Sequence, residues 1–275
     1  MNTKELFGME NPWEYVAAMY DPNNLECLYG DQNNYVCAGD CKVIDDYNQK
    51  VKNPSDEIIT KIPAEPWWGN PLKARLIILS LNPGYVPEVN ETLAKLLQTN
   101  EAVRRQLINY KAKTLRLEAE AFLPEEETED GCPISCKDAV NILGDWYWVK
   151  MLRQLKEDVE KKNGQINEEV FYRQVALIEY CGYSSVTAKI SLPLNEEGSY
   201  GFLKKLVSYI SKKEDVRFLI MRDSYRWDRL LKEIECSDDK IWRRKPRSRS
   251  QYITPGNFEN DVYKKIVESL ACKGE

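Results

Sequence analysis

An apolar run that ends in a Pro-Gly turn constrains the fold of this chain more than any other feature. Residues 74–81 read Ala-Arg-Leu-Ile-Ile-Leu-Ser-Leu and are followed directly by Asn82-Pro83-Gly84. A short continuous apolar run bounded by turn residues is typical of a strand that is buried on both faces. The run therefore predicts a central strand of a sheet that is covered on both sides.

Apolar runs of the same kind recur later in the chain and alternate with helical stretches. We expect further strands at 175–181, 216–221 and 241–243. We expect helices at 88–121, where leucine and valine recur at three- and four-residue steps, and at 138–162, 199–212, 224–235 and 258–272, with Asn257 in the N-cap region of the last. Strands that alternate with helices are typical of an open, mostly parallel α/β sheet.

The length of 275 residues suits one large domain or two small ones. We expect a single α/β domain over 1–275, with its core in 71–272. Residues 1–70 are predicted to be an irregular N-terminal elaboration, because Asn, Asp, Gly and Pro are frequent there. Five aromatic residues of this segment are available to pin it onto a core: Trp13, Tyr15, Tyr20, Tyr29 and Tyr35.

The chain contains no histidine. This absence excludes Ser-His-Asp and Cys-His catalysis, any imidazole general base and any imidazole metal ligand. The 39 basic and 44 acidic residues give a net charge of -5, so bulk charge does not make the molecule a polyanion binder. Contacts with nucleic acid would need a local basic patch.

The cysteines and the N-terminus bear on cofactors and location. Eight cysteines without an export signal favour reduced thiols, and Cys27, Cys37 and Cys41 lack the paired C-x-x-C spacing of thiolate metal sites. We therefore expect no metal and no cofactor. No apolar run approaches the roughly 18 residues that span a bilayer, which predicts a cytoplasmic protein without membrane contacts.

Ligands of open α/β sheets bind beyond the carboxyl ends of the strands, so the residues that follow each strand are candidates for a site. Asn82 offers a donor and an acceptor at the first strand tip, while Pro83 and Gly84 make a tight turn that lets a ligand approach the backbone. Tyr85 comes next. Glu179 ends the second strand and is a further candidate, against the alternative that 179–185 is only a strand running into a turn.

A basic segment follows the last predicted strand. Residues 242–252 contain five cations, namely Arg243, Arg244, Lys245, Arg247 and Arg249. The segment leads through Tyr252 into Thr254-Pro255-Gly256-Asn257, where a helix is expected to open. A helix N-terminus beside arginines suits an anion, and arginine among serines and aromatics suits contacts with nucleic-acid backbone and bases. The alternative is a solvated loop.

Taken together, these motifs resemble the uracil-DNA glycosylase superfamily. The strand and turn over 76–84, L-I-I-L-S-L-N-P-G, are most similar to the G-I-N-P-G first motif of its mismatch-specific branch. The order of P-W-W-G-N-P, L-S-L-N-P-G-Y, I-E-Y-C-G-Y-S-S and R-S-R-S-Q-Y-I-T-P-G-N also resembles bacterial proteins placed beside that superfamily. The similarity covers roughly residues 66–270, and the first motif is its specific part.

This resemblance implies a three-layer α/β/α sandwich and a DNA-repair hydrolase that cleaves the N-glycosidic bond of a modified or mismatched base. It implies that Asn82 positions the attacking water or contacts the base, that Pro83 and Gly84 shape the pocket wall, and that Tyr85 stacks on a flipped base. The aromatic pair Trp67 and Trp68 is predicted to be packed in the core rather than to form a stacking shelf.

The sequence departs from the superfamily at the second motif, which commonly contains His-Pro-Ser. Here the corresponding position holds R-S-R-S-Q-Y-I-T-P-G-N, and Arg249 is the candidate that stabilises an anionic leaving base in place of the histidine. Two alternatives to an N-glycosylase remain open. One is a non-catalytic nucleic-acid or nucleotide-binding protein that uses the same strand-tip pocket, and the other is a hydrolase of a small nucleotide metabolite.

Overall fold

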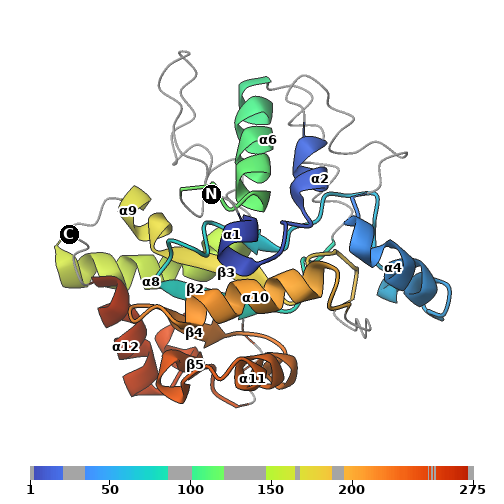
Figure 1. Cartoon of the computed structure of the whole chain (residues 1–275). Coiled ribbons are helices and arrows are strands. Elements are labelled where there is room, and N and C mark those ends of the chain that lie inside the picture. Colours follow the sequence, from blue (N-terminus) through green and yellow to red (C-terminus); the bar gives the residue numbers. More distant parts are fainter. Residues whose placement is uncertain are drawn as a thin grey trace. The chain divides into compact units, whose positions relative to one another are not determined.

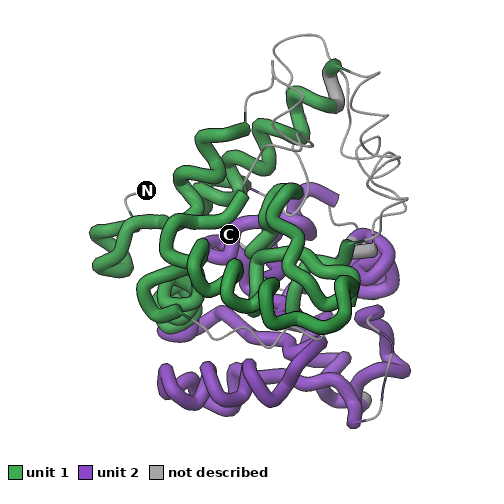
Figure 2. Tube along the Cα trace, turned by 90° about the vertical axis from the view of Figure 1, so that its right-hand side faces the viewer, with its two compact units in different colours: residues 1–67, 81–119, 179–210 green, residues 68–80, 120–178, 211–275 purple. Residues whose placement is uncertain are grey.

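The computed structural model describes residues 3–20, 35–85, 101–120, 147–164, 168–187, 195–246, 248, 250 and 252–271. The chain divides into two compact units, drawn in two colours in Figure 2. Unit 1 comprises residues 1–67, 81–119 and 179–210, and unit 2 comprises residues 68–80, 120–178 and 211–275. Each unit is therefore assembled from three stretches that are separated in the sequence.

A five-stranded mixed sheet lies in unit 2, apart from one terminal residue of β1 and one of β3, which cluster with unit 1. Its strands follow the order β1-β3-β2-β4-β5, and β2 pairs with β4, and β4 with β5, in parallel. All five residues of β2 are buried, as expected of a strand covered on both faces. The bounds are β1 (Trp67–Trp68), β2 (Leu76–Ser80), β3 (Val175–Glu179), β4 (Arg217–Ile220) and β5 (Ile241–Arg243).

The predicted α/β class is confirmed, and so are the strands expected at 74–81, 175–181, 216–221 and 241–243. Their ends differ from the expected ends by no more than two residues. Continuous apolar composition is a strong signal for strands of this kind, because both faces must be free of charge. The helices of unit 2 are labelled in Figure 1 and are α8 (Tyr147–Asn163), α9 (Glu168–Arg173), α11 (Ser224–Glu233) and α12 (Asn260–Ala271), with short 3₁₀ turns η3 (Asp238–Lys240) and η4 (Pro255–Asn257).

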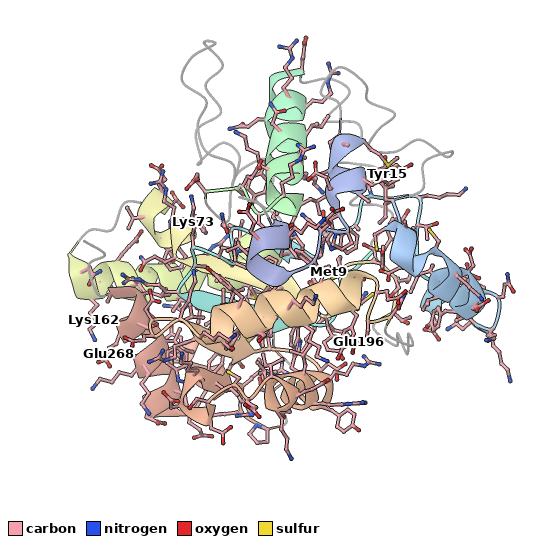
Figure 3. All side chains as sticks on the ribbon, in the orientation of Figure 1. Met9, Tyr15, Lys73, Lys162, Glu196 and Glu268 are labelled. Carbon is pink, nitrogen blue, oxygen red and sulfur yellow. The ribbon has the colours of Figure 1, made fainter. Side chains whose placement is uncertain are left out.

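Helices α8 and α12 pack against each other in unit 2. The hydroxyl of Tyr263 on α12 donates to Asp158 Oδ2 on α8 at 2.8 Å. The ends of the two helices are joined by an ion pair of 2.9 Å between Lys162 and Glu268, both labelled in Figure 3. Helix α11 is fixed to the sheet by its buried Trp227, whose indole Nε1 donates to the carbonyl of Ser80 at 2.6 Å.

Unit 1 has an aromatic core. Trp13 packs edge-on against Trp67 with ring centroids 6.4 Å apart and lies 5.2 Å from the ring of Tyr183. Phe202 covers the other side of Trp67 at 5.9 Å. The helices of this unit are α1 (Thr3–Phe7), α2 (Glu14–Ala18), α4 (Cys41–Asn48), α6 (Glu101–Leu115) and α10 (Ser199–Ser211), with 3₁₀ turns η1 (Ala38–Asp40) and η2 (Pro54–Asp56).

The prediction that residues 1–70 are irregular is wrong for much of the segment, which contains α1, α2 and α4. These helices have only five to eight residues, too few for an apolar repeat to stand out among frequent Asn and Asp. Trp13, Tyr20 and Tyr35 are buried as expected, whereas Tyr15 is exposed. Tyr29 lies outside the described residues.

Two expected helices extend beyond what the structure describes. Of the expected helix 88–121, residues 101–115 form α6. Residues 86–100 and 121–146 lie outside the described residues, and the second of these stretches includes the start of the expected helix 138–162. Helices 199–212, 224–235 and 258–272 are confirmed as α10, α11 and α12. None of the helices in the described part of the chain is long and apolar enough to cross a membrane.

Candidate functional site

Asn82 lies two residues beyond the end of β2 and is buried, with 3% of its surface exposed. Its amide nitrogen Nδ2 donates to the carbonyl of Pro83 at 2.9 Å and to Ser185 Oγ at 3.1 Å. Its amide oxygen Oδ1 is also buried and accepts no hydrogen bond from the described residues. The strand tip therefore carries a fixed amide with one acceptor to spare.

The segment 184–187 supports this turn from one side. The amide of Tyr85 donates to the carbonyl of Ser185 at 3.1 Å, and Gly84 forms a parallel bridge with the same residue. On its other side the segment is paired with 55–59, since Ile59 N donates to Ser184 O at 2.9 Å and Thr187 N to Ser55 O at 3.0 Å. Three chain segments that are far apart in the sequence thus hold Asn82 in place.

Gly84 is the exposed residue of the turn. It is exposed, its backbone is outside the left-handed region, and a Cβ placed on it would meet nothing within 4 Å. Neither conformation nor packing among the described residues therefore requires glycine here. Pro83 beside it is buried and Tyr85 is partly exposed, so the turn presents a bare stretch of backbone next to a ring.

Glu179 is the last residue of β3 and is 2% exposed. Its amide donates to the carbonyl of Pro66 at 2.9 Å, which joins β3 to the segment that precedes β1. The turn that follows is tightly packed, because a Cβ on Gly182 would lie 2.8 Å from Pro66 and 3.1 Å from Trp13. This packing agrees with the alternative in which 179–185 is a strand running into a turn.

A buried polar cluster, which sequence reasoning missed, lies at the start of α10. The carboxylate of Asp40 accepts from the Tyr183 hydroxyl at 2.7 Å, from Cys37 Sγ at 3.1 Å and from the amide of Ser199 at 3.2 Å. Burial, and then the charge of Asp40, raise the pKa of Cys37 to about 12. Burial, then the neighbouring Cys37 and Asp40, likewise raise the pKa of Tyr183. The Cys37 thiol and the Tyr183 hydroxyl therefore keep their protons, and Cys37 is a structural residue rather than an activated nucleophile.

The basic loop belongs to unit 2. Arg243 is exposed and pairs with Asp228 at 2.7 Å, and Arg244 Nη1 donates to the carbonyl of Ser250 at 2.6 Å. The amide of Lys245 donates to the carbonyl of Asn257 at 2.9 Å. Arg247 and the predicted catalytic residue Arg249 lie outside the described residues.

Asn257 organises this loop. Its Oδ1 accepts from Ser248 Oγ at 2.9 Å, and its Nδ2 donates to Ser250 Oγ at 3.1 Å and to the carbonyl of Tyr252 at 2.7 Å. Asn257 lies in η4, whereas α12 begins at Asn260, so its side chain serves the loop and not the helix end where it was expected. The ring of Tyr252 is 42% exposed beside it.

The structure brings Asn82, Pro83, Gly84 and Tyr85 together in unit 1, and Arg243, Arg244, Lys245, Tyr252 and Asn257 together in unit 2. The expected partnership of Asn82 with Arg249 stays a prediction. Trp67 and Trp68 are each 2% exposed, and Trp67 Nε1 donates to the carbonyl of Thr114, so the two rings are packed as predicted.

The described residues hold no cluster of three or more Cys, Asp or Glu side chains arranged to bind a metal. Cys37 lies in the polar cluster, Cys41 Sγ faces the carbonyl of Cys37 at 3.6 Å, and Cys27 lies outside the described residues.

Ser185 lies within the candidate stretch 179–185, but its contact with Asn82, which is 103 positions away, has no local signal in the sequence. No model of a known protein family matches this sequence, and no curated protein and no solved structure is significantly similar to the chain.

Proposed function

We propose that this protein has a uracil-DNA glycosylase-like three-layer fold and hydrolyses the N-glycosidic bond of a modified or mismatched base in DNA. The observation that carries the proposal is the buried Asn82 amide at the tip of β2, whose Oδ1 has no partner among the described residues and lies beside the exposed backbone of Gly84. A buried polar atom without a partner costs free energy, and such atoms are concentrated where a ligand or water completes them.

Each of the remaining parts has a stated task. A base must leave the stack, which costs a few kcal/mol, and stacking on Tyr85 would return about 1 to 3 kcal/mol of it. Arg243, Arg244, Lys245 and Arg247 are assigned to the phosphates, and Tyr252 and Asn257 to the substrate beside them. The proposal places the protein in the bacterial cytoplasm, where its DNA substrate is found.

The proposed reaction is a displacement by water. The water oxygen forms a bond to the sugar C1′ and releases one proton to solvent, while the C1′–N bond breaks and its electron pair leaves with the base, which takes up a proton from solvent. Asn82 Oδ1 contacts the base by accepting its ring N–H, and Arg249 stabilises the negative charge on the departing base. No imidazole is needed for these steps, in accord with a chain that has no histidine.

The decisive experiment is an abasic-site assay with the full chain. Single- and double-stranded oligonucleotides carrying one uracil, hypoxanthine or alkylated base are incubated with protein and scored by alkaline cleavage. We expect cleavage by the wild type, a loss of at least about 100-fold in Asn82→Ala, and wild-type rates in Asn195→Ala. Asn195 is a suitable control because it is partly exposed and its side-chain amide donates to the carbonyl of Gly39 instead of to the strand tip. No abasic product on any substrate, or equal rates in wild type and Asn82→Ala, overturns the proposal.

The alternative function is non-catalytic binding of nucleic acid or nucleotide. It is favoured by one observation, the hydrogen bonds that join Asn257 to Ser248, Ser250 and Tyr252 in the described part of the basic loop. Binding through phosphates weakens steeply with salt, and a triple change of Arg243, Arg247 and Arg249 to Ala should flatten that dependence. Absence of DNA binding at low salt excludes this alternative together with the enzyme.

A further inference from the structure

The orientation of the Asn82 amide is determined by its neighbours. The carbonyl oxygen of Pro83, 2.9 Å from the amide, can only accept a hydrogen bond. The atom that faces it must therefore be the nitrogen Nδ2, since an oxygen in that place would set two acceptors against each other. One hydrogen of Nδ2 is thereby assigned.

Ser185 assigns the other hydrogen. Its hydroxyl donates to the carbonyl of Thr187, and this leaves Oγ with lone pairs only for the Nδ2 hydrogen that lies 3.1 Å away. Ser185 is 1% exposed and its backbone is fixed by Tyr85 and Gly84, so the hydroxyl has little freedom to choose another partner. The chain from Asn82 through Ser185 to Thr187 thus runs in one direction.

Both hydrogens of the Asn82 amide are donated to Pro83 and Ser185, and the buried acceptor Oδ1 has no partner in the part of the chain that the structure describes. Such an atom attracts a neutral N–H group, because a low local dielectric strengthens the hydrogen bond. The same atom repels the oxygens of a carboxylate or a phosphate. The polarity of Oδ1 therefore favours ligands with an N–H donor over anionic ligands, whatever their shape.

We propose that Ser185 is a positioning residue, which locks the Asn82 amide so that the site takes a neutral ring carrying an N–H donor. The nature of that ring as a nucleobase rests on the proposed function, whereas the lock does not. A pyrimidine whose N1 carries the sugar still offers N3–H, and a 6-oxopurine still offers N1–H. Bases without an N–H on that edge are excluded.

The lock is tested first without any ligand. In amide spectra of ¹⁵N-labelled protein, the side-chain hydrogens of Asn82, assigned through Asn82→Ala, should exchange with solvent at least tenfold more slowly than those of the exposed Asn53. Ser185→Ala should remove most of that protection. Ser184→Ala is the matched control, because Ser184 is also buried but meets Ile59 through its main chain. Equal protection in wild type and in a folded Ser185→Ala protein overturns the lock.

The selectivity is tested with pairs of probes that differ by one methyl group. We expect 1-methyluracil or 9-methylhypoxanthine to bind at least tenfold more tightly than its N3- or N1-methylated counterpart, as measured by ligand-observed NMR. The preference should fall below threefold in Ser185→Ala and persist in Ser184→Ala. A preference that is absent in the wild type, or unchanged in Ser185→Ala, overturns the selectivity. Protected amide hydrogens together with no binding of any probe would instead leave the lock standing and count against the nucleobase function.

Discussion

At the scale of single residues, a substitution at Gly84 is expected to affect DNA binding without lowering stability. A methyl group at this position meets nothing within 4 Å and requires no change of backbone region. We expect Gly84→Ala to leave the free energy of unfolding unchanged or to raise it by up to about 1 kcal/mol. DNA affinity should fall about tenfold, because the methyl group occupies the bare backbone that the base is proposed to approach. Urea denaturation and fluorescence anisotropy measure the two effects.

Gly198 provides the contrast within the same unit. A Cβ there would overlap the carboxylate of Asp40 and lie 3.4 Å from the backbone of Gly39. Overpacking of this kind costs about 1 to 3 kcal/mol. Gly198→Ala should therefore lower the urea midpoint clearly. If Gly84→Ala destabilised the protein as much as Gly198→Ala does, Gly84 would be a structural residue.

Cys37 makes stability depend on alkaline pH. The pKa of its thiol is raised from 9.0 to about 12 in the folded protein, mainly by burial and then by Asp40. The unfolded chain therefore loses this proton at a lower pH than the folded chain does. The resulting stabilisation is complete below pH 9 and is lost as the pH rises through 9 to about 12, in the same direction as the raised pKa of Tyr183.

Urea denaturation at several pH values from 8 to 11 measures this dependence. Cys37→Ala should show a shallower decline than the wild type above pH 9, because one of the two groups is gone. A thiol reagent at pH 8 should modify Cys37 only after unfolding, since the folded thiol is protonated and buried. Rapid modification of Cys37 in the native protein would contradict the assignment.

At the scale of elements, Asp40 determines how α10 begins. It accepts from the first amide of the helix, that of Ser199, at 3.2 Å, and it satisfies the Tyr183 hydroxyl at 2.7 Å. Asp40→Ala removes a charged acceptor and leaves the buried Tyr183 hydroxyl with only its longer contacts to Cys37, which costs about 2 to 4 kcal/mol. Hydrogen exchange should show faster opening in the first turn of α10, with a smaller effect in Asp40→Asn. Unchanged protection of that turn would exclude the capping role.

The loop around Asn257 should respond to mutation in two distinguishable ways. Asn257→Ala removes the contacts to Ser248, Ser250 and Tyr252 but no charge. We expect DNA affinity to fall about tenfold at every salt concentration, since ordering the loop now costs entropy. Lys245→Ala should instead reduce the slope of log affinity against log salt by about one. Identical slopes in all three proteins would remove Lys245 from the phosphate contacts.

The elements differ in how much of them the sequence predicts. Strands β2 and β3 are recognisable because burial of all five residues leaves a continuous apolar run, as in Leu76–Ser80. Helices α1, α2 and α4 are not, because they are held by tertiary contacts such as that of Trp13 with Trp67, and not by an apolar repeat of their own.

The same holds within the site. Asn82 is visible from sequence because a turn must follow a strand, whereas its dependence on Ser185 is set by the pairing of 84–85 with 185. The polar cluster of Cys37, Asp40, Tyr183 and Ser199 joins three distant segments. Contacts of this kind have no local signal.

At the scale of the whole molecule, no single cut separates the two units. A fragment of residues 1–119 lacks the part of unit 1 in 179–210, and a fragment of residues 120–275 lacks β2, which lies between β3 and β4 in the sheet. We expect neither fragment to fold alone. Circular dichroism and one-dimensional NMR on each fragment test this, and sharp, dispersed spectra from either one would show that it holds a complete core.

The pairing of β2 with β4 has a consequence for folding during synthesis on the ribosome. Leu76 pairs with Arg217 in the sheet, and this pairing cannot form until Arg217 has been synthesised, about 140 residues later. At typical speeds of about 5 to 20 residues per second, the most apolar strand leaves the exit tunnel many seconds before its partner. During that interval we expect the exposed apolar strand β2 to bind a nascent-chain chaperone. A slower translation rate between codons 81 and 217 would lengthen the exposure of this strand.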